Sequence, residues 1–509
     1  MSCATDSERN ATALVPHARM TRAVRALRAA ASLGALVLAA CATPGDRAPR
    51  ATRVDPATVA SGLATSASRT AWPRDGWWRA WRDPQLDTLV ADAIAGNPAI
   101  RVAQARADRF VELARIAGAT RYPSAAVDAD FSRARFARYA SPSPPGGNTV
   151  WNNSVGADLR YALDLWGKHR SEHEGALADV QAAAADARAA RLMLETAVVR
   201  TYIVFAKTFD QRDVALATLK RQQDIVGIVE RRARAGLASR FELTQASTPI
   251  AATRAQIEAL DRQIAVLRNE LAVLAGRGPG AGAPLARPAL RLDVPVALPA
   301  NLPAELVGHR PDVVAARWRI ESMSSAIRAA KADFYPNIDL IASAGLASAA
   351  FGGFFTLVNN DAMTHRFGAA ISLPIFDGGR RQGRYGAAVA DYDVAVETYN
   401  QAVLGAFRDV ANQIELLQSL ARQQADVEAS ADTARRAVDY AMQGYRAGLT
   451  DYLTVLSTET ERLQAQQSLA DVRAARLDAW AQLMAALGGG VEPPTAPAAT
   501  APEGASDVR

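Results

Sequence analysis

Residues 380–410 read RRQGRYGAAVADYDVAVETYNQAVLGAFRDV, a stretch in which apolar side chains recur at steps of three and four. The recurring positions are Val389, Tyr392, Val396, Tyr399, Val403, Ala406 and Val410. This spacing places all of them on one stripe of an α-helix, and a stripe sustained over several heptads is typical of coiled packing between helices. We therefore predict a long helix near 380–444. At 1.5 Å per residue it would be about 100 Å long.

The same pattern occurs about 212 residues earlier, where only Arg191 interrupts it. It predicts a first long helix near 168–232, whose stripe is Leu177, Val180, Ala184, Ala187, Leu194 and Val198. The helices that follow also match, with Ile257, Leu260, Ile264, Leu267, Leu271 and Leu274 against Leu469, Val472, Arg476, Ala479, Leu483 and Ala486. An offset held through the whole copy predicts an internal tandem duplication. We place the first repeat at 77–276, a linker rich in Gly and Pro at 277–301 and the second repeat at 302–490.

Each long helix is followed by Arg-Ala-Gly-Leu, at residues 234–237 and again at 446–449. Glycine readily adopts the left-handed conformation that ends a helix, so Gly236 and Gly448 predict turns into helical hairpins. Small residues, among them Ala182 to Ala185, dominate the seams and allow helices to approach closely. They favour a thin-walled tube, although a solid bundle would show the same heptads.

Short runs of alternating polarity follow Tyr122-Pro123 and Tyr335-Pro336. They predict four strands. The apolar residues that alternate with polar ones in the four runs are Val127, Ala129, Phe131; Val155, Ala157, Leu159, Tyr161, Leu163; Ile338, Leu340, Ala342, Ala344; and Phe367, Ala369, Ile371, Leu373. Strands of a soluble sandwich alternate in the same way, but a strand tilted across a bilayer also has about this length. In lipid only a closed barrel pairs every backbone group, and the smallest barrels have about eight strands. A membrane location therefore predicts an oligomer, and a trimer would supply twelve strands.

Before the strands, helices are predicted near 84–120 and, in the second repeat, near 302–333. Trp77, Trp78 and Trp81 precede the first of these, and we expect them to form a local core. After the second repeat, residues 491–509 are rich in Pro and Ala and are expected to be a disordered tail.

The first 40 residues have the pattern of a signal peptide, with arginines before a short apolar run. Met20 is expected to be the true start. The run ends in Leu38-Ala39-Ala40-Cys41, which resembles a bacterial lipobox and predicts cleavage before Cys41 and acylation of that residue; an ordinary secretory signal is the alternative. Three acyl chains would make a permanent anchor. Ala42, in place of aspartate, is similar to the sorting pattern for the outer membrane, and residues 41–76 form a lipid-anchored tether.

Composition excludes several classes of protein. The chain has 509 residues, of which 49% are hydrophobic, and no run reaches the roughly 18 apolar residues of a membrane-spanning helix. The net charge of +6 is scattered, without a basic stripe for nucleic acid. His169 and His173 have the spacing of two metal ligands, but no third ligand is near, so a solvated helix face is expected. No catalytic constellation is found, so we expect neither enzyme activity nor a cofactor.

The chain resembles the TolC-type outer-membrane efflux channels, and among them the lipid-anchored NodT-like group. The resemblance spans roughly Trp77 to Gly490. It rests on Arg310-Pro311-Asp312-Val313, Ala329-Ala330-Lys331-Ala332-Asp333-Phe334-Tyr335-Pro336, Leu373-Pro374-Ile375-Phe376-Asp377-Gly378-Gly379-Arg380, Tyr445-Arg446-Ala447-Gly448 and Leu487-Gly488-Gly489-Gly490.

The resemblance implies a homotrimer that combines a twelve-strand β-barrel in the outer membrane with a periplasmic α-barrel of twelve helices. Such channels dock on a periplasmic adaptor protein and an inner-membrane pump, often proton-driven, and export small toxic compounds. The adaptor would contact the helix turns at Ala235, Gly236, Leu237, Arg446, Gly448 and Leu449. Leu453 matches a position that narrows the closed periplasmic aperture. Ser457 stands where lipid-anchored relatives often have aspartate, and Asp451 is the candidate substitute.

Other functions remain open at this point. Type I protein secretion uses ducts of the same kind, although the lipobox favours efflux. A structural envelope lipoprotein made of coiled coil would share the helices and the acyl anchor but not the strands. A periplasmic enzyme would need a polar constellation that the sequence does not contain.

Overall fold

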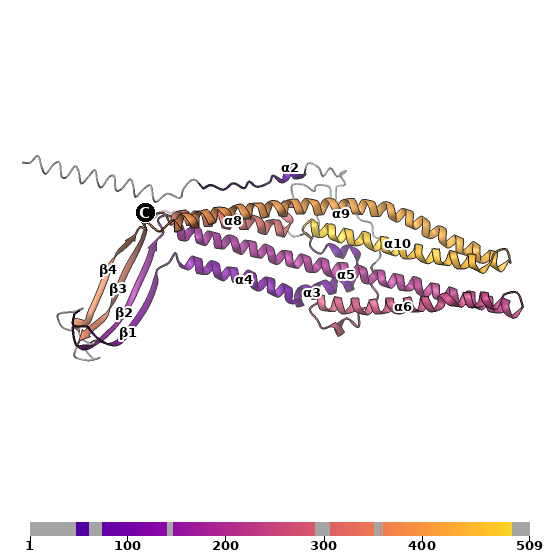
Figure 1. The fold of residues 1–509 in the computed structure, drawn as a ribbon, viewed down its shortest axis with the longest axis horizontal. Helices are drawn as coiled ribbons and strands as arrows, with labels where there is room; N and C mark the ends of the chain where they lie inside the picture. Colours follow the sequence, from indigo (N-terminus) through magenta and orange to yellow (C-terminus); the bar gives the residue numbers. More distant parts are fainter. Residues whose placement is uncertain are drawn as a thin grey trace, which may run out of the picture. The chain divides into compact units, whose positions relative to one another are not determined.

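Helices make up most of the computed structural model, which describes residues 47–60, 74–139, 146–290, 306–350, 357 and 360–490 (Figure 1). The two longest are α5 (Lys168–Arg234) and α9 (Arg380–Arg446), each of 67 residues. Each is followed by a helix of 35 residues, α6 (Arg240–Leu274) or α10 (Tyr452–Ala486). The predicted long helices and their hairpin partners are therefore confirmed. None of the helices described is long and apolar enough to cross a membrane.

The chain divides into two compact units. The first contains Ile116–Glu174 and Met323–Tyr392, and the second contains Arg50–Arg115, Gly175–Ser322 and the chain from Asp393 onward. Each unit draws on both predicted repeats. The first unit holds a β-sheet, whereas the second holds most of the helices.

The sheet has four antiparallel strands in the order in which they occur along the chain (Figure 1). They are β1 (Ser124–Arg135), β2 (Thr149–Leu163), β3 (Asn337–Ala350) and β4 (Met363–Ser372), with a short 3-10 turn, η4 (Asn360–Ala362), before β4. The four predicted strands are confirmed. β2 pairs with β3, so the sheet joins the two repeats, and within the described residues β1 and β4 are its edges.

The register of the strands separates polar from apolar side chains. Asp158 pairs with Ala126 on one side and with Ser343 on the other, and Ser343 pairs with Arg366, so this row crosses the whole sheet on one face. The opposite face carries Val127 and Phe367, whose side chains are 76% and 84% exposed. The single chain therefore leaves an apolar sheet face uncovered.

At the end of the sheet next to the helices, residues of the two predicted repeats contact each other. Trp166 stacks on Tyr335 with ring centroids 4.6 Å apart, and its indole N–H donates to the carbonyl of Pro336 over 2.8 Å. Asp377 belongs to the Leu-Pro-Ile-Phe-Asp-Gly-Gly-Arg motif. Its carboxylate accepts hydrogen bonds from the backbone N–H groups of Gly379 and Arg381 and forms an ion pair with the Arg381 guanidinium. This carboxylate thus caps the start of α9.

The single helix predicted at 84–120 is wrong, because the segment forms two helices, α3 (Pro84–Gly96) and α4 (Pro98–Ala119). Pro98 has no backbone N–H and disfavours helical geometry at the residue before it, so the chain breaks at Asn97. Asn97 compensates by donating from its side chain to the carbonyl of Leu274 over 2.8 Å. In the second repeat, α7 (Leu306–His309) and α8 (Pro311–Ala332) break in the same way at Arg310.

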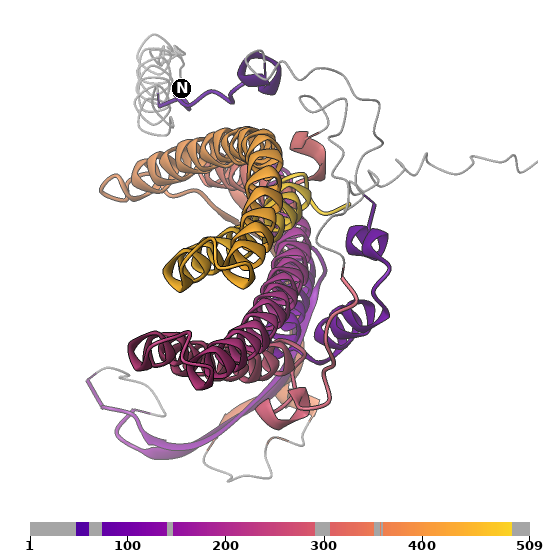
Figure 2. The same ribbon diagram turned by 90° about the vertical axis from the view of Figure 1, so that its right-hand side faces the viewer.

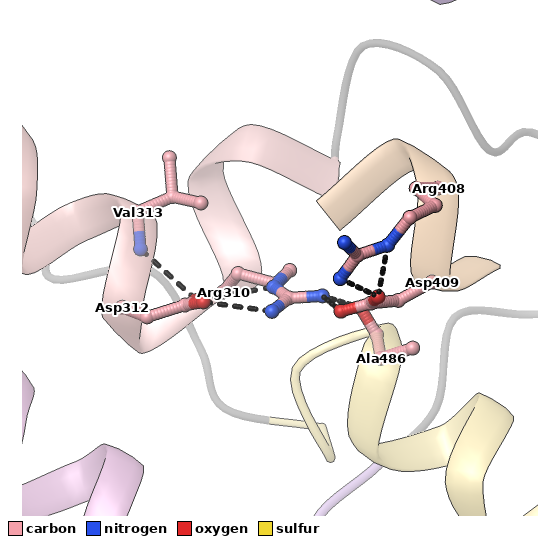
Figure 3. Close-up of polar contacts among 6 residues, drawn as sticks. All are labelled: Arg310, Asp312, Val313, Arg408, Asp409 and Ala486. Carbon is pink, nitrogen blue, oxygen red and sulfur yellow. Dashed lines mark hydrogen bonds and ion pairs between the residues drawn. The ribbon is translucent and has the colours of Figure 1, made fainter. Parts of the chain in front are cut away.

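At the second break the charged side chain of Arg310 takes the place that the Asn97 amide has at the first (Figure 3). Its guanidinium makes two hydrogen bonds to Asp312, of 3.0 and 2.7 Å, and reaches both Asp409 of α9 and the carbonyl of Ala486 at 3.4 Å. Arg408 also donates to Asp409. Leu274 and Ala486 occupy matching positions of the two predicted repeats, so the two broken helices are fastened to corresponding carbonyls by different side chains.

A cluster of buried aromatic side chains lies at the beginning of the helical unit. The 3-10 helix η1 (Trp77–Trp81) buries all three tryptophans, as expected, and Trp77 and Trp81 each lie 5.3 Å from the ring of Trp480. Buried Asp83 caps α3 and also accepts from the hydroxyl of Tyr202 over 2.7 Å and from the backbone N–H of Ala289 over 2.9 Å. Residues after the short helix η2 (Pro279–Gly282) are thereby held against α3 and α5.

The predicted seam is correct in α9 and only partly correct elsewhere. In α9 six of the seven predicted positions are buried, including Val396, Val403 and Val410. In α5 the predicted stripe is buried at Leu194 and Val198 but exposed at Leu177. The buried positions at that end are instead Ala178, Ala182 and Ala185. α5 packs through its alanines there because they allow the closest approach between helices.

A segment of the predicted tether lies along α9, close to the short helix α2 (Pro56–Ala60) (Figure 1). Asp393 accepts hydrogen bonds from the backbone of Arg50 and Ala51, at 2.9 and 3.0 Å. Buried Asn400 accepts from the backbone N–H of Val54 over 2.8 Å and donates to the carbonyl of Thr52 over 3.0 Å. One amide side chain thus binds both polar groups of an extended backbone.

Replacing Asn400 with alanine is expected to release this segment, because both backbone hydrogen bonds to it are lost. Two hydrogen bonds of about 1 kcal/mol each predict that trypsin cleaves after Arg50 and Arg53 roughly thirtyfold faster. Mass spectrometry of a time course measures the rate. Gln401→Ala, a substitution of the exposed neighbour, is the control and should cleave like the parent. Equal rates for Asn400→Ala and the parent would show that the segment is not held there.

Candidate functional site

The turns that join α5 to α6 and α9 to α10 lie at the same end of the helical unit (Figure 2). Gly236 has φ 71° and Gly448 has φ 74°, the left-handed conformation predicted for both. In the first turn the backbone N–H of Leu237 donates to the Arg232 carbonyl over 2.8 Å, and in the second Leu449 donates to Gly444 over the same distance. These bonds satisfy carbonyls that the helix end leaves free.

The helices that leave the two turns begin with different caps. Ser239 and Glu242 form a capping box at the start of α6, with the Ser239 backbone N–H donating to the Glu242 carboxylate over 2.6 Å. At the matching place in α10, Asp451 accepts from the backbone N–H of Thr454 over 2.9 Å and from its hydroxyl over 2.6 Å. These Thr454 donors hold the pKa of the Asp451 carboxyl below its ordinary value. The acidic side chains nearest the turns are therefore engaged in helix capping.

A cluster of buried side chains, here called the turn-end cluster, joins the two hairpins. Its members are Ile225, Val229, Ala246, Ala441, Tyr445, Tyr452 and Val455. Arg232 of α5 lies over the ring of Tyr445 at 4.7 Å and donates to the Tyr445 carbonyl over 2.9 Å. Cation–π attraction and the hydrogen bond together fix the end of α5 to the end of α9.

Two tyrosines give this cluster a polar interior. Burial, together with smaller contributions from neighbouring Tyr445 and Glu459, raises the pKa of Tyr452 to about 12. Burial also raises the pKa of Tyr445, whose hydroxyl is buried without a hydrogen-bond partner among the described residues. Both phenols therefore stay neutral at physiological pH.

A buried ion pair lies further along α10. Arg462 is 0% exposed, and its guanidinium donates to Glu459 over 2.9 Å, to Gln466 over 2.7 Å and to the Thr218 hydroxyl of α5 over 3.2 Å. Arg221 lies 3.9 Å from the Glu459 carboxylate. The pair therefore connects α10 to α5 below the turn-end cluster.

The candidate residues named from the sequence occupy different parts of this end. Leu237 and Leu449 are exposed at the two turns, and Leu453 is half exposed on α10. Ser457 is exposed, and its hydroxyl donates to the Thr454 carbonyl of its own helix. Cys41 lies outside the described residues. The two histidines have different neighbours, since His169 contacts Glu172 and His173 contacts Arg121. In the described part of the chain no group of three or more potential ligands could hold a metal ion.

Sequence reasoning missed Arg232, Tyr445, Glu459 and Arg462 as parts of the site. One signal was present, because the heptad of α10 continued toward the turn places Arg462 at a seam position, with Glu459 one turn before it on the same helix. Charged residues at seam positions are rare unless they are paired. Their partners on α5 could not be identified without the tertiary structure.

Comparison with known proteins agrees with this architecture. The sequence matches the family described as "Outer membrane efflux protein" over residues 89–277 and 302–489. It is 37% identical to the fusaric acid resistance protein FusA of Burkholderia cepacia over 481 residues, covering 90% of this chain and 87% of FusA. It is 30% identical to the multidrug resistance outer membrane protein MdtP of Escherichia coli K12, covering 83% of this chain and 88% of MdtP.

A solved structure has the same fold. The outer membrane protein VceC of Vibrio cholerae superimposes with a TM-score of 0.76 at 30% identity, covering 83% of this chain and 100% of VceC. The resemblance drawn from the sequence is confirmed by these matches. The chain belongs to the outer membrane efflux protein family, whose members are channels of the outer membrane and not enzymes.

Proposed function

We propose that three copies of this chain form the outer-membrane duct of a tripartite efflux system. The copies pool their sheets into a twelve-strand barrel through the membrane, and their helices form a twelve-helix tube across the periplasm. Small toxic compounds enter from a periplasmic adaptor and a proton-driven inner-membrane pump and pass through the duct passively. The observation that carries this proposal is the four-strand sheet with one uncovered apolar face and two free edges.

The sheet fits a barrel wall in length and in polarity. Its strands have 12, 15, 14 and 10 residues, and about 9 to 11 residues are enough for a tilted strand to cross the hydrocarbon. Exposed Val127 and Phe367 suit the lipid side, whereas Asp158, Ser343 and Arg366 suit a water-filled lumen. Four strands leave two edges whose backbone groups need partners in lipid, and strands of neighbouring copies supply them.

The helices fit the tube in a similar way. Sixty-seven residues of α-helix extend about 100 Å, far more than a globular core requires. Leu177 of α5 belongs to the predicted apolar stripe but is exposed. A neighbouring copy that covers it would extend the seam to that end of the helix, as a closed ring of helices requires.

Sites can then be assigned within the duct. Leu453, with Asp451 and Ser457, lines the periplasmic aperture, and an acidic ring, if formed, comes from Asp451. Residues Ala235, Gly236, Leu237, Arg446, Gly448 and Leu449 contact the adaptor. Cys41 carries the acyl anchor after cleavage at residue 40, and residues 41–76 are the tether. The predicted signal peptide and the predicted tail at 491–509 lie outside the described residues. Two separate family matches, at 89–277 and 302–489, support the tandem duplication with its linker at 277–301.

The relatives favour small organic cargo over secreted proteins. Their names refer to fusaric acid resistance, toluene efflux and multidrug resistance. A wide passive tube leaves the choice of cargo to the pump, so the class of cargo is inferred from these names and not from residues of the duct. The coiled-coil envelope lipoprotein is disfavoured because it has no use for the sheet.

Electrophoresis and planar-bilayer recording test the proposal together. The detergent-extracted protein is expected to migrate in dodecyl sulfate as a trimer that dissociates on boiling, and to conduct ions in bilayers. A stable monomer without conductance would overturn the duct. A trimer without conductance would favour the envelope lipoprotein.

A further inference from the structure

The two turns match in sequence but differ in charge. Around the α5–α6 turn, Arg231, Arg234 and Arg240 are all exposed. The matching positions of the α9–α10 turn, 212 residues later, are exposed Gln443, exposed Arg446 and buried Tyr452. The first turn thus presents three guanidinium groups where the second presents one.

No carboxylate balances these arginines within the described residues. None of the three forms an ion pair there, and Arg234 reaches only the carbonyl of Glu230 in its own helix, at 3.5 Å. Glu242, the acidic residue closest to the turn on α6, is engaged in the capping box with Ser239. The positive charge at this turn is therefore available to a partner.

The position of Arg240 is not explained by the stability of its own helix. Arg231 and Arg234 lie in the last turn of α5, where cations interact favourably with the helix dipole. Arg240, however, is the first residue of α6, at the end of a helix where a cation is unfavourable. A side chain placed against the preference of its own helix indicates a role outside that helix.

Exposed apolar side chains accompany the arginines. Leu237 is 69% exposed and Phe241 is 70% exposed, and they lie between and beside the charged positions in the sequence. An apolar centre with a charged rim is the usual anatomy of a protein interface, in which the apolar residues supply affinity and the rim supplies rate and specificity.

We propose that the α5–α6 turn, with Leu237 and Phe241 as apolar anchors and Arg231, Arg234 and Arg240 as a basic rim, docks a helical hairpin whose own turn is acidic. This inference rests on the proposed function, because it specifies the chemistry of the adaptor tip. The α9–α10 turn, which lacks two of the three arginines, docks a hairpin tip without a requirement for acidic charge. The two turns of one chain are therefore unequal docking sites, and the basic turn decides which adaptors are accepted.

Two synthetic helical hairpins test the charge requirement. They have identical apolar residues and differ only in three turn positions, which are glutamate in one and lysine in the other. Binding to the full-length protein in detergent is measured by surface plasmon resonance at low and high ionic strength. We expect the acidic hairpin to bind roughly tenfold more tightly at low salt, and the difference to disappear near 1 M salt, where the Debye length is about 3 Å.

Matched variants locate the effect. Arg240→Glu removes a charge that disfavours α6 and replaces it with one that favours it, so this variant is expected to fold. Alone or with Arg231→Glu, it should abolish or reverse the preference for the acidic hairpin. Gln443→Glu introduces a glutamate at the position of the other turn that matches Arg231 and should leave the preference unchanged.

Three outcomes would overturn the proposal. The first is equal binding of both hairpins to the parent protein, and the second is an equal loss of preference in Gln443→Glu and Arg240→Glu. The third is a loss of trimer heat stability in Arg240→Glu with unchanged hairpin preference, which would assign the arginines to contacts between copies. Conductance of the parent is recorded in parallel, so that a failed duct is distinguished from a working duct with a charge-indifferent turn.

Discussion

Replacing Arg462 with methionine is expected to destabilise the helical unit by about 3–5 kcal/mol, the usual cost of removing one partner of a buried ion pair. Glu459 has a side chain only 6% exposed and would be left without its closest cation. The Thr218 hydroxyl and Gln466 would lose their bonds as well. Arg221, 3.9 Å from Glu459, offsets part of this cost and argues for the lower end of the range. Urea denaturation followed by helical circular dichroism measures the change.

Two variants control this result. Glu459→Gln combined with Arg462→Met removes both charges and should recover most of the stability, because no isolated charge remains buried. Arg221→Met removes a partly exposed cation 3.9 Å from the same carboxylate and should cost at most about 1 kcal/mol. If Arg462→Met were no more harmful than Arg221→Met, the buried pair would not be the connection between α10 and α5 that its geometry indicates.

Replacing Gly488 with alanine is expected to cost about 2–5 kcal/mol. Gly488 has φ 88°, and a left-handed conformation costs a residue with a side chain roughly 1–2 kcal/mol. A Cβ at this position would also overlap the backbone carbonyl of His309, directly before the break that Arg310 supports, and such overpacking adds about 1–3 kcal/mol. The same denaturation experiment measures the loss.

Gly448→Ala separates the two contributions. Gly448 has φ 74°, but a Cβ built there meets nothing within 4 Å, so only the conformational cost of about 1–2 kcal/mol applies. Gly276, the match of Gly488 in the first repeat, would overlap the carbonyl of Gly96 and should resemble Gly488. Equal losses for Gly488→Ala and Gly448→Ala would refute close packing at the helix break as the cause.

The helix breaks depend on local sequence and on distant contacts. Pro98 and Pro311 are visible in the sequence, and they explain why α3 and α4 and then α7 and α8 are separate helices. Helical periodicity alone nevertheless predicts one helix at 84–120, because it does not register a single break at Pro98. The broken ends become stable only because Asn97 and Arg310 find carbonyls 177 and 176 residues away in the sequence.

The sequence motifs identified the family but not the structural roles of their residues. Motifs around Arg310, Tyr335, Asp377 and Gly448 were sufficient to recognise an efflux channel, and the matches over 89–277 and 302–489 confirm it. The roles of these residues in the fold became apparent only from their contacts. Arg310 holds a helix break together, Tyr335 stacks on Trp166, and Asp377 caps α9.

The sequence by itself determined most of the elements and their order and predicted the repetition, because these follow from periodicity, proline and glycine acting within a few residues of each other. It also determined the turns at Gly236 and Gly448 and the four strands. Only the tertiary structure decided which stripe of α5 is buried, why Glu459 and Arg462 are tolerated inside, and that Arg232 is fixed to Tyr445. These outcomes depend on side chains that meet from distant parts of the chain, and no local pattern encodes such a meeting.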